Sequence, residues 1–339
     1  MSRILMVTPV LKSQRGNSIT AARLYNGLSK RGYAIDLLSQ DEPGWQLQLD
    51  LLTRTHSYNL VHGLHALYFS PVANHPAVKK LPVLLTTTGT DINYDLAGPG
   101  KEETLHTLLM ADRIVVFNHD LGRKLADADP RLEPRLAVVP QGVDLPDAPA
   151  VSRSQYGLSP GDTVFIIPSG LRPVKNLDLA IDGLAVAQGG HPGLSLLVVG
   201  AEIDSAYTDH IKSRLRELPW AIYTGEVPHH SISGIMRIAD VVINTSLAEG
   251  QPQAVLEAMS LGKPCILSAV PGNLGIISDG VHGCYINTAE ELSDAALRLI
   301  RDPGLRHDMG SAARKLVNEK YSVEKEIDAY AGLYESLLS

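Results

Sequence analysis

Short apolar runs recur along the first part of the chain, with helical segments between them. A short unbroken apolar run is typical of a strand buried on both faces, so these runs predict a parallel sheet. An apolar stripe over residues 18–31 predicts the first helix, with Ser18 as its cap and Gly32 at its end. The expected strands are residues 4–7, 34–38, 59–62, 82–86, 113–117 and 136–139.

A segment rich in proline, residues 140–154, interrupts this pattern and predicts a linker. The pattern then restarts and alternates between strands and helices to the end of the chain. This alternation predicts an α/β fold of two Rossmann-like domains, residues 1–150 and 151–322, with parallel sheets and a cleft between them. The expected strands of the second part are residues 163–167, 196–199, 222–224, 241–244 and 265–268. Its expected helices are residues 176–188, 205–218, 252–261, 289–301, 305–320 and 327–338.

The composition is that of a globular protein, with 44% apolar and 20% charged residues. Aromatic residues make up only 5%, so the core must consist of aliphatic side chains, which favours parallel strands over a β-sandwich. The net charge is −7, and residues 1–150 are neutral because they hold 15 basic and 15 acidic side chains. This balance argues against a nucleic-acid partner and against a broad basic face that docks on a membrane.

The two cysteines, Cys265 and Cys284, lack the spacing of metal ligands and imply no disulfide framework. The first apolar run is too short for a signal peptide, and no apolar stretch of about 18 residues predicts a membrane helix. We therefore expect a cytoplasmic protein, which is a monomer or a homodimer.

The stretch AEGQPQAVLEAMSLGKPCILSAVP, residues 248–271, carries the most specific pattern. Pro252 suits the first turn of a helix and Gly262 its end, which places Glu249 before the helix and Glu257 on its second turn. Glu257 can then accept two hydrogen bonds from a ribose diol. Each part alone is also common in surface helices, so the signal lies in the whole string.

The first turn of that helix offers backbone donors. The amides of Gln253, Ala254 and Val255 are expected to be unpaired at a positive helix end, which suits phosphate oxygens.

This stretch resembles the Glu-(seven residues)-Glu motif of the family-4 retaining glycosyltransferases, or glycosyl transferases group 1. Similar segments include ADRIVVFNHD, VVPQGVDL, SGLRPVKN, TGEVP, ADVVINTS and YSVEKEIDAYAGLYESLL. The resemblance implies the GT-B fold, in which two Rossmann-like domains face each other. It implies that the second domain binds a nucleotide sugar, that the first binds the acceptor, and that a last helix, residues 323–339, packs back on the first domain. It also adds Glu226, Val227, Gly250 and Gln251 to the donor-binding residues.

Two basic side chains, Arg172 and Lys175, follow a predicted strand in SGLRPVKN. At the carboxyl end of a parallel strand, a guanidinium and an ammonium can together neutralise a diphosphate. The resemblance makes them the diphosphate-binding pair of the family, although most relatives separate the two by more residues. The alternative is a solvated loop with two unrelated charges.

The segment RGNSITAAR joins the first strand to the first helix. Gly16 allows close approach of a ligand, and with Asn17 it opens a helix end that offers donors to a phosphate or sugar. This loop is not the GxGxxG fingerprint, so a nicotinamide enzyme loses support. Thr20 and Arg23 follow either as acceptor contacts or as parts of an exposed helix face.

His62 and His65 flank the end of a predicted strand, where a side chain can hydrogen-bond a sugar hydroxyl; the resemblance favours His65. The next strand ends in TTTGTDINYDL, where Thr88 stands in place of a histidine that many relatives carry. Asp91 is the nearest replacement group. Three roles stay open for it: a sugar contact, orientation of the acceptor, or a helix cap.

We expect transfer of a sugar, with retained anomeric configuration, from a nucleoside diphosphate sugar to a small soluble acceptor, and UDP is favoured as the nucleotide. Lys175 and Arg172 would stabilise the departing diphosphate, and Glu249 would hold a hydroxyl of the transferred sugar. Catalytic roles are also assigned to Asp91 and His65. No cofactor and no metal are implied beyond the donor substrate.

The patterns GNxxTAxR, GTDxxxD and LRxVKN narrow the resemblance to a compact subset. This subset includes the glycosyltransferase-1-domain-containing protein 1 group and, more distantly, selenosugar synthases. One alternative is therefore a transferase that forms a selenosugar or thiosugar. The other is a module that binds a nucleotide sugar without turning it over.

Overall fold

The computed structural model describes residues 2–12 and 16–339. The chain forms two compact units. Unit 1 contains the residues up to Gly142 and those from Tyr321 onward, and unit 2 contains Val143–Lys320.

The boundary between the units lies earlier than the sequence pattern placed it. The segment after Gly142 packs on unit 2, because the amide of Ala148 donates to Ser233 Oγ (2.9 Å) and Arg237 donates to the Ala148 carbonyl oxygen (2.8 Å). The linker residues 143–150 are thus part of unit 2.

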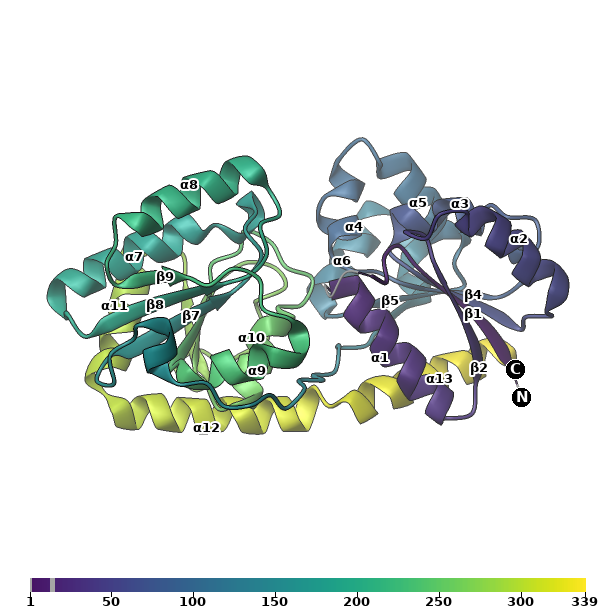
Figure 1. Cartoon of the computed structure of the whole chain (residues 1–339). Coiled ribbons are helices and arrows are strands. Elements are labelled where there is room, and N and C mark those ends of the chain that lie inside the picture. Colours follow the sequence, from purple (N-terminus) through teal and green to yellow (C-terminus); the bar gives the residue numbers. More distant parts are fainter. Residues whose placement is uncertain (1, 13–15) are drawn as a thin grey trace. The chain divides into compact units, whose positions relative to one another are not determined.

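Unit 1 is built on a six-stranded parallel sheet in the order β2-β1-β3-β4-β5-β6 (Figure 1). All six apolar runs of the first part of the sequence are strands of this sheet. The strands are β1 (Arg3–Thr8), β2 (Ala34–Ser39), β3 (Leu60–Leu64), β4 (Val83–Thr86), β5 (Arg113–Val116) and β6 (Leu136–Val138). The helices of unit 1 are α1 (Gly16–Lys30), α2 (Trp45–Thr55), α3 (Ala66–Ala73), α4 (Thr90–Asn93), α5 (Lys101–Met110), α6 (His119–Ala128) and α13 (Val323–Leu338), with short 3-10 turns η1 (Val78–Lys80), η2 (Asp95–Ala97) and η3 (Pro130–Arg135).

The C-terminal helix α13 lies beside α1 in unit 1 (Figure 1). Arg23 of α1 and Glu326 of α13 form a buried ion pair with two hydrogen bonds, Nε to Oε2 at 2.6 Å and Nη2 to Oε1 at 2.9 Å. Gly142 allows close packing here, because a Cβ at this residue would lie 2.6 Å from the Cα of Val323.

A buried polar network fixes α13 against the sheet. His62 Nδ1 lies 2.7 Å from the Tyr334 hydroxyl, and its Nε2 lies 2.8 Å from Thr86 Oγ1. The Tyr330 hydroxyl lies 3.0 Å from the same Thr86 oxygen. Burial lowers the pKa of His62 to about 3, so its ring is neutral and this histidine is structural.

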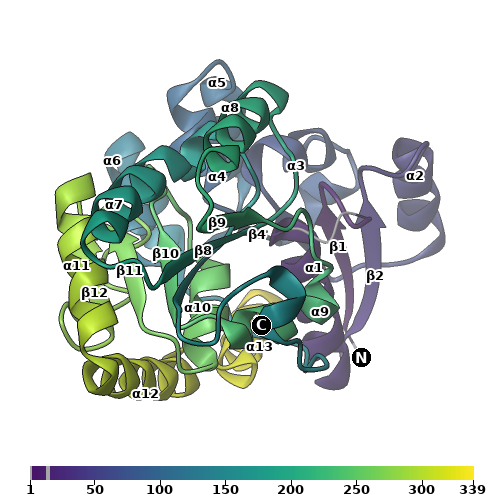
Figure 2. The ribbon, with the colours of Figure 1, turned by 60° about the vertical axis from the view of Figure 1, so that its left-hand side comes forward.

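Unit 2 has a second six-stranded parallel sheet, in the order β12-β11-β10-β7-β8-β9 (Figure 2). Of its strands, β12 was not predicted from the sequence. The strands are β7 (Thr163–Pro168), β8 (Leu194–Val199), β9 (Ala221–Tyr223), β10 (Val241–Asn244), β11 (Cys265–Ser268) and β12 (Gly283–Ile286). The helices are α7 (Leu177–Gly190), α8 (Ser205–Arg216), α9 (His229–Ile238), α10 (Gln253–Ser260), α11 (Ala289–Arg301) and α12 (Pro303–Lys320), with 3-10 turns η4 (Arg153–Tyr156) and η5 (Pro173–Lys175).

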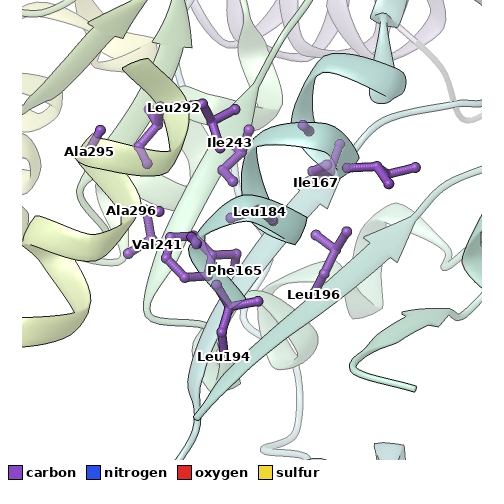
Figure 3. Close-up of a cluster of buried hydrophobic side chains, with 14 of the residues drawn as sticks. Phe165, Ile167, Leu184, Leu194, Leu196, Val241, Ile243, Leu292, Ala295 and Ala296 are labelled. Carbon is purple, nitrogen blue, oxygen red and sulfur yellow. The ribbon is translucent and has the colours of Figure 1, made fainter. Parts of the chain in front are cut away.

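The main core of unit 2 lies between this sheet and the helices α7 and α11 (Figure 3). Phe165 of β7, Leu196 of β8 and Ile243 of β10 point to the same side and meet Leu184 of α7 and Leu292 of α11. Successive strand residues point to opposite faces, and both faces are covered by helices. This is why the strands read as unbroken aliphatic runs. No helix in residues 2–12 and 16–339 is long and apolar enough to cross a membrane.

Candidate functional site

Both sheets have a point at which the strand order reverses. In unit 1 it lies between β1 and β3, and in unit 2 between β7 and β10. Ligands of open α/β sheets bind beyond the carboxyl ends of the strands at such a switch point. In unit 2 the two loops at this point are joined, because Thr245 Oγ1 donates to the Lys175 carbonyl oxygen (3.2 Å) and the Leu247 amide donates to that of Val174 (2.8 Å).

Glu249 lies at the centre of the unit 2 switch point, in the loop between β10 and α10. Its Oε1 accepts hydrogen bonds from Lys175 Nζ (2.6 Å), Asn244 Nδ2 (2.9 Å) and Ser246 Oγ (2.6 Å). Burial tends to raise the pKa of Glu249, but Lys175 and the two other donors outweigh it and lower the pKa below its ordinary value. Glu249 is therefore held as a carboxylate beside an ammonium.

The loop after β11 supports this carboxylate from behind. Asn273 is fully buried, and its Nδ2 donates to Asn244 Oδ1 (3.1 Å), which fixes the amide that binds Glu249. Gly272 has a φ of +92°, and a Cβ at this residue would lie 2.1 Å from the Glu249 carbonyl oxygen. Only glycine combines a positive φ with so close an approach to the neighbouring backbone.

Arg172 and Lys175, the predicted diphosphate pair, lie on one short loop after β7. Lys175 ends η5, and Arg172 precedes that turn as its cap residue. In the described part of the chain, Arg172 Nε is buried without a hydrogen-bond partner. A buried donor of this kind is costly unless a ligand or water accepts from it. Lys175 is already paired with Glu249, but an ammonium has three donors.

Glu257 lies on the second turn of α10, as the sequence predicted, and it is 5% exposed. Its Oε1 lies 3.0 Å from Nε2 of His229, the first residue of α9. The histidine orients one oxygen of the carboxylate.

The start of α10 differs from the expectation. Pro252 is the cap residue, and it forms an inverse γ-turn with φ −76° and ψ 74°, in which the Gln253 amide donates to the Gln251 carbonyl oxygen (2.8 Å). The Val255 amide donates to the Pro252 carbonyl oxygen (3.0 Å). The prediction that Gln253 and Val255 offer unpaired amides is therefore wrong. For the Ala254 amide the expectation stays a prediction.

The remaining donor candidates of unit 2 lie on two loops. Gly250 and Gln251 continue from Glu249 to the start of α10. Glu226 and Val227 follow β9, with Glu226 exposed and Val227 half-buried.

His65 lies at the switch point of unit 1, directly after β3. Its φ of +69° is rare for a residue with a side chain, and such strained conformations cluster at functional sites. The imidazole is buried, with Nε2 3.4 Å from Thr90 Oγ1 and 3.7 Å from Asp95 Oδ2.

Asp91 is fully buried and accepts hydrogen bonds from backbone amides on two loops. Oδ1 binds the amides of Thr88 and Gly89 (both 3.0 Å), and Oδ2 binds the amide of Ala66 (3.0 Å). Asp91 is the second residue of α4 and not its cap residue, which is Gly89. Asp91 fixes the loops around His65 rather than meeting a ligand, and its assignment as a catalytic group is corrected to that of a positioning residue.

The candidates on α1 differ in exposure. The helix begins at Gly16, so Ser18 lies inside its first turn and does not cap it, while Arg15 lies outside the described residues. Gly16 is exposed and Asn17 is half-buried. Thr20 is buried and accepts a hydrogen bond from Gln141 Nε2 (3.3 Å).

Arg23 is also buried, at 4% exposure, and its guanidinium is engaged by Glu326. The assignment of Arg23 to an acceptor is therefore corrected: this residue holds α13 on unit 1.

Sequence reasoning missed Asn244, Ser246 and Asn273, which hold or support Glu249. Polar residues that directly follow the apolar run VVI of β10 were the available signal for the first two. Asn273 lies in the loop after β11, and no sequence pattern pointed to it. Among the described residues, no cluster of three or more histidine, cysteine, aspartate or glutamate side chains is arranged to hold a metal ion.

Residues 150–316 match the family model described as glycosyl transferases group 1, which covers most of unit 2. The chain is 25% identical over 337 residues to the glycosyltransferase 1 domain-containing protein 1 of Xenopus tropicalis, over 96% of each chain. It is 23% identical over 270 residues to the N-acetyl-alpha-D-glucosaminyl L-malate synthase of Bacillus anthracis, over 77% of this chain and 69% of that protein.

Solved structures share the fold. The structure of Anabaena HepE in complex with UDP and glucose matches with a TM-score of 0.82 at 18% identity, over 99% of this chain and 100% of that chain. The predicted GT-B fold class is confirmed.

Proposed function

Residues 150–316 belong to the glycosyl transferases group 1 family, and from this premise we propose that the chain transfers a sugar from a UDP-sugar to an acceptor with retention of anomeric configuration. The observation that carries the proposal is the contact of 2.6 Å between Lys175 Nζ and Glu249 Oε1 at the switch point of unit 2. A cation that neutralises a diphosphate and a carboxylate that binds sugar hydroxyls are thereby held side by side.

In this proposal unit 2 binds the donor. Glu257 accepts hydrogen bonds from the ribose hydroxyls, while Arg172, Lys175 and the Ala254 amide face the diphosphate. Donors that are fixed before the reaction stabilise the charge that develops on the leaving group, without the cost of reorganising solvent. No metal ion is part of this scheme.

The chemical step then needs no protein nucleophile. The acceptor oxygen forms a bond to the anomeric carbon on the face from which the diphosphate leaves, and its proton passes to the leaving phosphate oxygen. Glu249 holds a hydroxyl of the transferred sugar during this step. The two glutamates are therefore not the acid–base pair of a glycoside hydrolase.

Radiolabelled nucleotide sugars test the proposal directly. We expect slow hydrolysis of one UDP-sugar to UDP in the absence of an acceptor. Binding of a nucleotide sugar without turnover, with every acceptor supplied, would contradict transfer and identify a binding module.

Two variants test the assignment of the glutamates. Glu257→Gln should weaken donor binding, since the loss of one charged acceptor on ribose is worth about 1.5–3 kcal/mol, or roughly 10- to 150-fold. Glu249→Gln should mainly lower the rate of UDP release. Glu217→Gln, at an exposed position of the same unit, is the control. Unchanged affinity and rate in both site variants would contradict the assignment.

A further inference from the structure

A second group of polar side chains lies in unit 1, beyond the carboxyl ends of β3 and β4. His65 follows β3, and Thr88, Thr90 and Asp95 follow β4. The hydroxyl oxygens of Thr88 and Thr90 are 3.4 Å apart, Thr90 Oγ1 is 3.4 Å from His65 Nε2, and that nitrogen is 3.7 Å from Asp95 Oδ2. These four residues are called the polar row below.

The contacts within the polar row are longer than ordinary hydrogen bonds, so its polar groups keep capacity to bond to a ligand. Hydrogen bonds of hydroxyl groups are usually about 2.7–2.8 Å long, and they weaken as they lengthen. In addition, His65 Nδ1 is buried and has no hydrogen-bond partner in residues 2–12 and 16–339. Buried polar atoms in native proteins are nearly always paired, so an unpaired one points to a ligand or a water that completes the site.

The backbone of the polar row is held in a strained state. His65 has a φ of +69°, and the Asp91 carboxylate fixes both loops through the amides of Ala66, Thr88 and Gly89. Strain of this kind persists only where the surrounding structure enforces it, and it is concentrated at binding and catalytic sites.

An exposed aromatic ring lies next to the polar row. Tyr68, in the first turn of α3, is 56% exposed, and its ring centroid lies 4.6 Å from that of His65 at an angle of 58°. Its backbone is anchored, because Gln40 Nε2 donates to the Tyr68 carbonyl oxygen (2.7 Å). The site thus joins a flat apolar surface to a row of hydroxyl, imidazole and carboxyl groups.

A ring with hydroxyl groups matches this combination. Its C–H face can pack on the aromatic ring, and its hydroxyl edge can both donate to Asp95 and exchange hydrogen bonds with the threonines. A carboxylate or phosphate on the same ring would approach the partly exposed Asp95 and the buried Asp91, which repel it.

We propose that the polar row and Tyr68 bind the acceptor, and that the acceptor is a neutral polyhydroxylated ring, a sugar or a cyclitol. This inference rests on the proposed glycosyl transfer, which supplies the reaction. It adds Tyr68, Thr90 and Asp95 to the residues that meet a substrate.

Matched acceptor pairs test the proposed class. With the donor that is hydrolysed, UDP release is measured with glucose against glucose 6-phosphate, and with myo-inositol against its 3-phosphate. We expect the neutral member of at least one pair to stimulate release with the higher kcat/KM, by about tenfold or more. Equal or better stimulation by the phosphorylated members, or by neither member of any pair, would overturn the inference.

Variants then connect the effect to the site. Tyr68→Ala should raise the acceptor KM about three- to tenfold, because it removes an aromatic contact. Tyr68→Phe keeps the ring and should behave as the wild type. Asp95→Asn removes a negative charge that repels a phosphate. It should therefore reduce the ratio of kcat/KM between the neutral and the phosphorylated acceptor. An acceptor KM that is equal in Tyr68→Ala and the wild type would contradict the site.

The two proposals fail in different ways. Absence of turnover with every donor and acceptor supplied contradicts glycosyl transfer but not the acceptor site. Binding of the neutral ring is then measured by saturation-transfer NMR with myo-inositol or methyl glucoside. Loss of that signal in Tyr68→Ala and its retention in Tyr68→Phe would still support the acceptor site. No signal in the wild type would overturn it.

Discussion

Three donors from two segments of unit 2 converge on a single oxygen of Glu249: Lys175 from the loop after β7, and Asn244 and Ser246 at the end of β10. They keep the pKa of this carboxyl below its usual value of 4.5, against the opposing effect of burial. A group whose pKa is lower in the folded state stabilises the fold above its unfolded pKa. This stabilisation is lost as the pH falls through the folded pKa.

Glu249→Gln tests this coupling. At pH 7 we expect the free energy of unfolding to fall by about 1–3 kcal/mol, because the variant replaces a charged acceptor beside Lys175 by a neutral one. The difference from the wild type should shrink as the pH falls below about 4.5. Urea unfolding of unit 2 at pH 7, 5 and 3.5 measures both effects. A difference that stays constant over this range would contradict the ionised state, and Glu217→Gln serves as the exposed control.

At the scale of single elements, the strands could be predicted from the sequence far better than the residues and turns that hold the site in place. A strand buried on both faces needs an apolar run and little else, so runs such as Ile4–Val7 located β1 and its neighbours. The start of α10 could not be predicted, because Pro252 turns the backbone. As a result, the amides of Gln253 and Val255 donate to backbone carbonyl oxygens just before them. Asp91 likewise acts through Ala66, 25 residues earlier in the chain, and such a partner has no local signal.

The helix α13 shows how an element that is distant in sequence completes a unit. It follows unit 2 in the chain, yet it covers the unit 1 sheet through Tyr330 and Tyr334, and Glu326 binds Arg23 with both side chains almost fully buried. Breaking a buried pair leaves an uncompensated charge, whereas replacing both partners by apolar groups need not.

A single and a double variant of this pair give the second stability prediction. Glu326→Ala should destabilise unit 1 by about 3–5 kcal/mol, because Arg23 stays buried without its partner. Arg23→Met combined with Glu326→Leu should recover most of this loss. The nearby pair of Arg31 and Asp328 is about half exposed, so Asp328→Ala should cost about 1 kcal/mol or less. Urea unfolding measures all four proteins. A double variant as unstable as Glu326→Ala would contradict a pair whose cost is charge burial.

At the scale of the whole molecule, the two units share a sheet design but carry different chemistry. Each sheet reverses its strand order once, and each switch point gathers polar side chains: Glu249 with Lys175 in unit 2, and His65 with Asp95 in unit 1. The chain leaves unit 1 after Gly142 and returns at Tyr321. The neutral and acidic halves of the sequence therefore correspond closely to separate units, and the acidic unit concentrates Arg172 and Lys175 where the proposed diphosphate binds.

Binding of UDP should accordingly stabilise unit 2. At a UDP concentration of about 100 times its Kd, binding adds about 2.7 kcal/mol to the stability of the unit that holds it. We expect hydrogen exchange to slow in peptides that cover β10 and α10, and to stay unchanged in α2, which follows the edge strand β2 of unit 1. Glu257→Gln at the same UDP concentration should lose most of this protection, because its Kd is higher. Protection of α2 equal to that of α10, or full protection in the variant, would contradict the placement of the nucleotide at the switch point between β7 and β10.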